Sequence, residues 1–478
     1  MKNLIGKEWL DSSDGSLIEI TNPATGELID TVPSSTLEDV DKCVQTAHTA
    51  QKEWAKIPMH KRGEILYKFA ELVENEKESL AKLLSDETGK PITEAIAEIS
   101  NTKIFVHGYV EKAKHMYGIN IPAGIEPGQE KCIQYTVQEP LGVVAAIIPF
   151  NFPCDLFGQK VPSALIMGNS VIIKPSTYNP LTLSRYGELL LKAGVPAGVV
   201  NVLHGEGKIV GQGLAAHPLV HCVSLTGSTA AGQETMATCS KNLTHVMLEL
   251  GGNDAFILLE DGDMDTAVEE TVWGRLYNTG QVCCASKRFL IHNSRKEEFI
   301  NRMIEKIKSM KQGMPSEPAT QIGCLINEGA AIKVEEQVNK TVDQGAKIVI
   351  GGKRKGAFYE PTILDNVTKD MDVAKDMEIF GPVISVIGFD DINEAIEIAN
   401  QSSYGLCGSV ISKNIKNAFK VAYALECGGA IINGASFYRS AEMPFGGWKY
   451  SGIGNEGISS TLRELSRTKT IILKNLLE

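Results

Sequence analysis

The segment NTGQVCCAS, residues 278–286, places a cysteine where chemistry on a carbonyl group is possible. Cys283 lies among glycine and small residues, so backbone and substrate can both approach its thiol closely. A thiolate at this position could attack a carbonyl carbon and form a covalent intermediate. The competing interpretation is an inert, buried pair with Cys284, because free cysteine is among the most often buried residue types.

Two further segments could assist such a nucleophile. In LELGGN, residues 248–253, Glu249 lies between leucines and ahead of a Gly-Gly bend. Partial burial there would raise its pKa and suit it to general-base catalysis. In PFNFP, residues 149–153, Asn151 follows an apolar run and could donate its amide N–H to a developing oxyanion. Taken singly, a solvated glutamate and an asparagine turn explain these segments as well.

Three more segments could bind a dinucleotide. VIIKPST (171–177) ends a predicted strand with a lysine and two hydroxyls, and SLTGSTAAG (224–232) has the order strand, glycine-rich turn, helix. Such a turn lets backbone N–H groups approach a diphosphate, although it is not the GxGxxG fingerprint. EIFGPV (378–383) begins with a carboxylate that could accept ribose hydroxyls. Ordinary turns and a surface glutamate are the alternatives. The candidate residues are Lys174, Ser176, Thr177, Gly227, Ser228 and Glu378.

Alternating strands and helices are needed to bring these segments together. Apolar runs at 141–148, 170–174, 199–203 and 220–225 predict strands, with helical stretches such as 180–193 between them. A second region of the same kind extends from about 251 to 450. Its strand candidates are 255–259, 289–292, 347–350, 383–389 and 408–411. This alternation predicts an α/β fold with parallel sheets, which bind ligands at the carboxyl ends of their strands.

Smaller features frame these two regions. Residues 35–38 resemble a capping box and predict that a helix begins near Ser35. Residues 119–138 suit a β-hairpin, and the alternating run 468–474 suits a terminal strand.

Composition limits the classes of partner. The 478 residues have a formal net charge of −11 and no basic tract, which argues against nucleic acid and anionic membranes as partners. The longest apolar stretch, 141–150, is too short to span a bilayer as a helix. Ten scattered cysteines without a CxxC pair predict reduced thiols in a cytoplasmic protein and no metal site.

In this order and at these spacings, the five segments closely resemble the aldehyde dehydrogenase superfamily. The resemblance extends from NPATG at 22–26 to PFGGWKYSGIG at 444–454. It implies two Rossmann-like α/β domains plus a small β oligomerisation domain, in a homodimer or homotetramer. The implied boundaries are 1–118 with 139–250 for the dinucleotide-binding domain, 251–464 for the catalytic domain, and 119–138 with 465–478 for the oligomerisation domain.

The resemblance also implies roles for individual residues. Cys283 matches the nucleophile, Glu249 the general base, and Asn151 the oxyanion-hole side chain, which acts with the backbone N–H of Cys283. Lys174 matches the contact to the adenosine ribose, and Glu378 the contact to the nicotinamide ribose. The implied cofactor-binding residues are Phe150, Asn151, Lys174, Ser176, Thr177, Gly227, Ser228, Leu250 and Glu378, with Gly227 and Ser228 at the diphosphate. The residues expected near the substrate are Phe152, Gln159, Val282, Cys284, Tyr438 and Arg439.

The implied reaction is the oxidation of an aldehyde to the carboxylic acid with NADP or NAD. The thiolate gives a thiohemiacetal and then a thioester, which water activated by the glutamate hydrolyses. Two alternatives remain open at this point. In an acylating relative coenzyme A takes the acyl group, although such relatives commonly lack the base that Glu249 provides. A non-catalytic structural or binding protein could also have the same fold.

Three positions refine the expected cofactor and substrate. NAD-preferring members often have glutamate where this chain has Thr177, so the carboxylate that would repel a 2′-phosphate is missing and NADP should be accepted or preferred. Members acting on phosphorylated aldehydes often have arginine where this chain has Val282, which is similar to relatives acting on small hydroxyaldehydes such as lactaldehyde. Arg439 could hold the carboxylate of a semialdehyde such as succinate semialdehyde, or could be a solvated surface residue.

Overall fold

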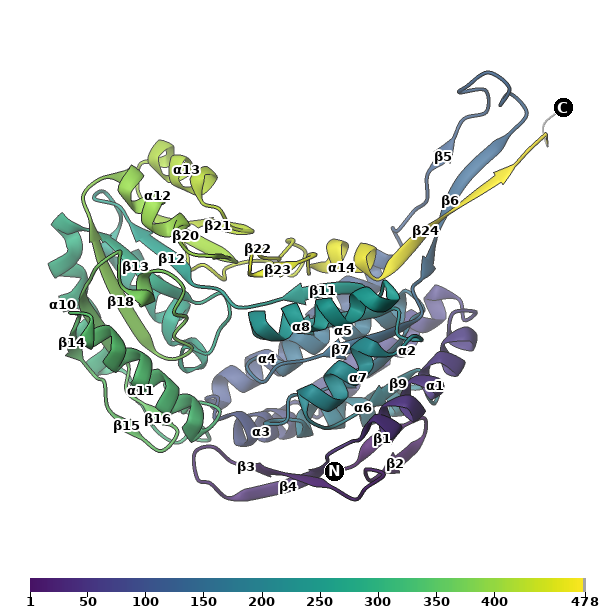
Figure 1. Ribbon diagram of the computed structural model, residues 1–478, viewed down its shortest axis with the longest axis horizontal. Helices are drawn as coiled ribbons and strands as arrows, with labels where there is room; N and C mark the ends of the chain where they lie inside the picture. The colour runs from purple at the N-terminus through teal and green to yellow at the C-terminus, as the bar shows by residue number, and fades with distance from the viewer. Residues whose placement is uncertain (476–478) are drawn as a thin grey trace.

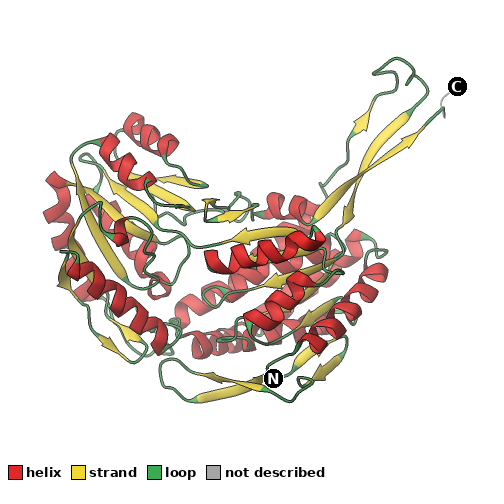
Figure 2. Cartoon of the chain, in the orientation of Figure 1, coloured by secondary structure: helices red, strands yellow, loops and turns green. Residues whose placement is uncertain are grey.

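The computed structural model describes residues 1–475 and shows two α/β lobes with a long β arm (Figure 1). The predicted α/β fold is confirmed, with mixed sheets in both lobes. Figure 2 shows that helices cover the strands of both lobes, whereas the arm consists of strands and loops only. Residues 476–478, the end of the segment expected to complete the arm, lie outside the described residues.

The first lobe contains an eight-stranded sheet in the order β2-β1-β9-β8-β7-β10-β11-β23. Its five central strands are parallel. They are β7 (Val143–Ile147), β8 (Ser170–Lys174), β9 (Val200–Val202), β10 (Cys222–Thr226) and β11 (His245–Glu249). Antiparallel strands flank them: β1 (Asn3–Ile5), β2 (Glu8–Leu10) and β23 (Gly452–Ile453).

Apolar residues on both faces explain why this sheet is buried on both sides. Val144 and Ala146 of β7 face one core, while Val143 and Ala145 face the other. The helices of the first face are α2 (Met59–Asn75), α3 (Lys77–Thr88), α4 (Ile92–Ala113), α5 (Pro153–Ile166) and α6 (Leu181–Ala193). Those of the second are α1 (Leu37–Trp54), α7 (Gln212–Ala216) and α8 (Thr229–Cys239).

The second lobe contains a seven-stranded sheet in the order β14-β17-β18-β13-β12-β20-β21. All its strands are parallel except β14 (Lys347–Ile350). The parallel strands are β12 (Asp254–Leu258), β13 (Ser286–His292), β17 (Thr362–Val367), β18 (Val383–Phe389), β20 (Cys407–Ile411) and β21 (Gly429–Ile432). One face packs on α9 (Met264–Thr271) and α10 (Asn293–Ser309). The other packs on α11 (Glu328–Asp343), α12 (Ile392–Asn400) and α13 (Ile415–Ala424).

The arm is a three-stranded antiparallel sheet that projects from the first lobe (Figure 1). It joins β24 (Ser466–Leu473), which follows α14 (Ile458–Glu464), to β6 (Ile133–Pro140) and β5 (Asn120–Ile121). The remaining strands of the described residues form three short two-stranded sheets. They are β3 (Leu17–Thr21) with β4 (Leu28–Pro33), β15 (Arg354–Lys355) with β16 (Phe358–Tyr359), and β19 (Tyr404–Gly405) with β22 (Trp448–Lys449). Among residues 1–475, no helix is long and apolar enough to cross a membrane.

The helix expected near Ser35 begins later than predicted. Leu37 is the first residue of α1, and Thr36 is its N-cap, with its side chain accepting from the N–H of Asp39. The Asp39 carboxylate accepts in turn from the N–H of Thr36, so the capping box is one residue out of the predicted register. Several strand limits agree with prediction, for example β8 and β18, whereas β11 and β17 were not predicted.

The turn that leads into β13 has unusual backbone geometry. Asn278 and Thr279 have positive φ angles of 49° and 54°, and Gly280 follows at 75°. This left-handed region is costly for a β-branched residue such as threonine. At Gly280, a Cβ atom would lie 2.3 Å from the carbonyl oxygen of Gly381. The turn before Cys283 is therefore pressed directly against the segment that precedes β18.

The close approach at Gly280 predicts that an added Cβ lowers the free energy of unfolding by more than the left-handed backbone conformation alone would. Gly15 is a matched control, because its φ of 74° is nearly the same but a Cβ there has no atom within 4 Å. We expect Gly15→Ala to cost about 1 kcal/mol for the left-handed conformation. Gly280→Ala should cost about 1–3 kcal/mol more, because the backbone of Gly381 must move. Urea unfolding followed by circular dichroism compares the two variants, and equal costs would contradict the close contact.

Candidate active site

The candidate residues of the first lobe lie at the carboxyl ends of its parallel strands. Lys174 ends β8 and Thr226 ends β10, where it pairs with Glu249 at the end of β11. Asn151 follows β7 and precedes α5. Ligands bind at this edge of a parallel sheet because strand ends and loops converge there. The second lobe contributes Cys283, three residues before β13 begins.

Hydrogen bonds from the first lobe hold the strained turn before Cys283. The backbone N–H of Asn278 donates to the Glu94 carboxylate at 2.8 Å, and its side-chain amide donates to the carbonyl of Asn151 at 2.9 Å. Gln281 accepts at its carbonyl from the Asn151 amide at 3.1 Å. Contacts with the other lobe therefore support this turn and position the thiol that follows it.

Asn151 lies where an oxyanion donor is needed. Its side chain is buried, and its Nδ2 reaches the carbonyl of Gln281, two residues before Cys283. One of the two Nδ2–H groups makes this contact, and the other can serve a substrate oxygen. Its backbone carbonyl accepts from Lys90 Nζ at 2.9 Å, so a buried cation fixes the main chain behind the amide.

Glu249 is a buried carboxylate, and its Oε2 has no hydrogen-bond partner among the described residues. Burial raises its pKa well above the ordinary range, and the charge of Glu456 adds to that rise. The Lys160 ammonium opposes the rise. Lys160 donates to Glu456 at 2.5 Å and to the Ser224 hydroxyl at 3.1 Å. A carboxylate in this environment has an unpartnered oxygen and a raised pKa, which together suit it to taking a proton from water.

The Cys283 thiol is partly exposed, unlike most cysteines of the chain. Its Sγ lies 4.0 Å from that of Cys284. This contact and burial raise the pKa of Cys283 well above its ordinary value. The positive charges of Lys287 and Arg439 act in the opposite direction. The thiol therefore needs cations nearby to reach the thiolate form.

A cluster of apolar side chains surrounds the thiol. It brings together the predicted Phe152, Val282 and Cys284 with Cys283. The other members are Ala285, Leu406, Cys407, Phe437 and Phe445. Two additional aromatic residues extend this wall: Tyr277 stacks on Phe152 at 6.0 Å between ring centroids, and Trp273 lies 4.4 Å from the ring of Phe437.

The remaining predicted substrate residues lie in different environments. The Arg439 guanidinium stacks on the ring of Phe445 at 3.5 Å, beside the cluster around Cys283. Tyr438 is exposed and lies edge-on to Trp273. Gln159 is buried on α5, and its Oε1 accepts from the Tyr109 hydroxyl at 2.5 Å. The Gln159 side chain is thus bound to a neighbouring helix.

The candidate cofactor residues line the same strand ends. Lys174 Nζ is buried and donates to the carbonyl of Pro175, and burial lowers its pKa to about 8. Ser228 caps α8, accepting from the N–H of Ala231 at 3.3 Å. The N–H of Gly227 donates to the carbonyl of Glu249 at 3.0 Å and is already engaged.

Other candidate cofactor residues shape the surroundings of these strand ends. Ser176 and Thr177 are half-buried after β8. Phe150 lies edge-on to Tyr178 and Phe380. A Cβ on Gly232 of α8 would lie 2.6 Å from the Leu250 side chain, so the glycine permits close packing there.

The donor set at these strand ends fits a dinucleotide. Thr226 Oγ1 is buried without a partner among the described residues, directly before the N-terminus of α8. Among residues 1–475, the one hydrogen-bond acceptor of Lys174 Nζ is the main-chain carbonyl of Pro175. A hydroxyl, an ammonium and a helix N-terminus can together bind ribose and phosphate oxygens.

Several important residues were not predicted from the sequence. They are Lys90, Lys160, Lys287, Glu456, Phe445 and Tyr277. Lys160 offers one usable signal, since a lone lysine within the apolar helix α5 must find a buried partner. The others depend on contacts between segments far apart in the chain.

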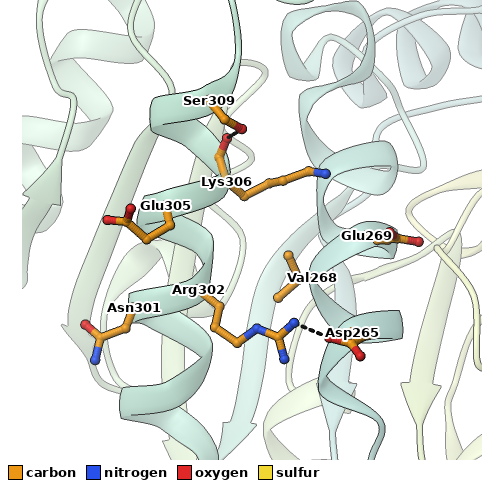
Figure 3. A pocket seen from close by; sticks show the side chains of 8 residues that line it. All are labelled: Asp265, Val268, Glu269, Asn301, Arg302, Glu305, Lys306 and Ser309. Carbon is orange, nitrogen blue, oxygen red and sulfur yellow. Dashed lines mark hydrogen bonds and ion pairs between the residues drawn. The ribbon is translucent and has the colours of Figure 1, made fainter.

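A separate hollow lies between α9 and α10 (Figure 3). Charged and polar side chains line it, and Arg302 pairs with Asp265 across it. It contains none of the residues that surround Cys283.

Comparison with known proteins places this geometry in a family. Residues 9–471 match the model of the aldehyde dehydrogenase family. The mitochondrial succinate-semialdehyde dehydrogenase of Oryza sativa subsp. japonica is 36% identical over 99% of this chain and 90% of its own length. The lactaldehyde dehydrogenase of Methanococcus aeolicus is 37% identical over 98% of this chain and 99% of its own.

A solved structure agrees with the sequence relatives. A 3,6-anhydro-L-galactose dehydrogenase in complex with NAP is 35% identical, with a TM-score of 0.95 over 99% of both chains. The likeness thus extends to nearly the whole chain in both sequence and structure. This chain belongs to the aldehyde dehydrogenase family.

Proposed function

We propose that this enzyme oxidises a small aldehyde to its carboxylic acid through a thioester on Cys283, with NADP or NAD as hydride acceptor. One observation supports this most strongly. Glu249 is a buried carboxylate with an oxygen that has no partner among the described residues, and the half-buried Cys283 is among the groups that raise its pKa.

The chain's own groups supply the addition step. Cys283 gives its proton to water and becomes a thiolate, which bonds to the aldehyde carbon, and the carbonyl oxygen becomes an oxyanion. The free Nδ2–H of Asn151 and the backbone N–H of Cys283 stabilise this oxygen. When bound, NADP or NAD accepts the hydride. The product of oxidation remains on the Cys283 sulfur as a thioester.

Hydrolysis then depends on Glu249. Its free oxygen takes a proton from water while the water oxygen bonds to the thioester carbon, and the sulfur leaves as thiolate. Since burial raises the pKa of Glu249, the base form becomes more populated as pH rises through that pKa. The steady-state rate should therefore increase over the same range.

The substrate we favour is a small aldehyde with an anionic or hydroxylated tail. Arg439 provides a cation next to the wall of Phe445 and Phe152, and Val282 keeps the space beside the nucleophile apolar and small. The relatives named succinate-semialdehyde dehydrogenase and lactaldehyde dehydrogenase support tails of these two kinds.

We further propose assembly into a homodimer or homotetramer through the arm. The strand β24 of the arm presents Ile472 to solvent, and the region before β6 exposes Tyr117, Ile119 and Ile125. Exposed apolar side chains on a projecting sheet favour a second copy as partner.

The domain boundaries 1–118 with 139–250, 251–464, and 119–138 with 465–478 remain part of this proposal. All ten cysteines lack disulfides, which supports a cytoplasmic location.

The two chemical steps can be separated by substitution. We expect Cys283→Ala to abolish aldehyde oxidation while cofactor still binds. Glu249→Gln should give a rapid burst of about one reduced nicotinamide per active site, followed by turnover slowed about 10²–10⁴-fold, because the thioester forms but is not hydrolysed. Stopped-flow absorbance measures both phases. Glu305→Gln, at an exposed ion pair with Lys308, is the control. A burst in the Cys283→Ala variant would refute the covalent route.

The tail preference can be tested at Arg439. We expect Arg439→Met to lower kcat/KM for succinate semialdehyde about 10–100-fold relative to butanal, because a charge-assisted contact to the tail is lost. The ratio between the two aldehydes cancels any general effect on Cys283. Arg302→Met removes a surface ion pair and serves as the control. An unchanged ratio would show that Arg439 does not bind the carboxylate tail of the substrate.

The cofactor preference can be tested at Thr177. We propose that NADP is preferred, since Lys174 and the Thr177 hydroxyl can donate to a 2′-phosphate and no carboxylate stands at 177 to repel it. Thr177→Glu should lower the NADP/NAD ratio of kcat/KM at least about tenfold. Thr177→Gln introduces a side chain of the same size as glutamate but without its charge, so it should change the NADP/NAD ratio of kcat/KM far less. A wild-type enzyme with a large NAD preference would contradict the proposal.

A further inference from the structure

Lys287 is a buried cation in contact with the main chain of Cys283. It is the second residue of β13, four residues after Cys283, and its side chain is only 2% exposed. Burying an ammonium is costly unless it is paired and hydrogen-bonded. The partners that stabilise the buried Lys287 ammonium therefore indicate its role.

Lys287 Nζ connects two parts of the site. It donates to the backbone carbonyl of Cys283 and lies 3.2 Å from Oε1 of Glu378. The ring of Phe380 lies 6.0 Å away. One ammonium thus contacts the main chain of the nucleophile and the carboxylate expected to hold the nicotinamide ribose.

Glu378 in turn rests on the Gly-Gly bend after β11. Its Oε1 accepts from the N–H of Gly252 at 3.4 Å. A Cβ on Gly251 would lie 2.6 Å from its Oε2, so the carboxylate occupies the space that the glycine leaves. Lys287 is therefore linked through Glu378 to the Gly-Gly bend, which begins two residues after Glu249.

The charge of Lys287 also acts on neighbouring groups. Burial raises the pKa of the Asp254 carboxyl to about 7, and Lys287 is the strongest opposing charge. Lys287 also lowers the pKa of Cys283 against the raising effects of Cys284 and burial. The other ionisable groups that act on or respond to Cys283 are Arg439, Glu249 and Cys407.

We propose that Lys287 is a positioning residue that fixes the main chain of Cys283 against Glu378 and favours the thiolate of Cys283 before any cofactor binds. The inference rests on Cys283 being the nucleophile of the proposed function. Glu378 partly neutralises the Lys287 charge, so the two residues should have opposite effects on the thiol.

The test is the pH dependence of Cys283 alkylation by iodoacetamide in the full-length enzyme, without aldehyde or cofactor. Fragment-ion mass spectrometry of the peptide that contains both Cys283 and Cys284 assigns the alkylated residue and so distinguishes Cys283 from the nine other cysteines. Lys287→Met keeps an unbranched side chain, one atom shorter, and removes the charge, and it should raise the apparent pKa of Cys283 by about one unit. Alkylation at a pH below that pKa should then be about tenfold slower.

Glu378→Gln should have the opposite effect, because the ammonium is left less neutralised. We expect the apparent pKa to fall by about half a unit, with faster alkylation at neutral pH. Lys287→Arg retains the charge and should stay closer to wild type than Lys287→Met does. Lys413→Met removes a lysine from an exposed pair with Asp263 and is the control for general effects.

Opposite shifts from Lys287→Met and Glu378→Gln support the proposal, since disruption of packing would move both variants in one direction. An unchanged profile in folded Lys287→Met, or an upward shift in Glu378→Gln, overturns it. If Lys287→Met does not fold, the direction of the Glu378→Gln shift decides. Because no aldehyde is present, failure here leaves the Glu249→Gln burst as an independent test of the proposed reaction.

Discussion

The active site depends on a strained turn that hydrogen bonds from both lobes support. Asn278 and Thr279 adopt left-handed geometry next to Gly280, and the turn is supported by Glu94 and Asn151 of the other lobe. Such strain persists only where the surroundings over-determine it. The position of the Cys283 thiol therefore depends on how the two lobes are placed relative to each other.

Three buried lysines, each paired with a glutamate, contact or act on Asn151, Glu249 and Cys283. Lys90 with Glu98 supports the main chain of Asn151, Lys160 with Glu456 lies behind Glu249, and Lys287 with Glu378 contacts Cys283 itself. Isolated buried charges would be prohibitive, and paired ones impose a defined geometry on what they touch. Each of the three residues to which we assign the chemistry is thus supported by its own ion pair.

The sequence allowed the α/β fold and most strand positions to be predicted, because apolar runs such as 170–174 and 383–389 are buried on both faces and bounded by polar turns. The strand β11 was not predicted, since its exposed start at His245 and its polar end at Glu249 do not read as a continuous apolar run. The segments around Cys283, Glu249 and Asn151 could be selected from their residue types and the family resemblance. Lys287 could not, because nothing local indicates that its charge meets Glu378, 91 positions later in the chain.

The loop between β21 and β23 is anchored in both lobes. It leaves the seven-stranded sheet after Ile432 and ends where Gly452 pairs with Glu249 on the eight-stranded sheet. Between these anchors it contributes Phe437, Arg439 and Phe445 to the substrate side, while the reacting groups belong to other segments. Substitutions in this loop therefore change the wall of the site around Cys283, and at Arg439 they also reach the thiol, because the Arg439 charge lowers the pKa of Cys283. One short stretch of chain thus has two roles, since it supplies part of the wall around Cys283 and also ties the seven-stranded sheet to the eight-stranded one.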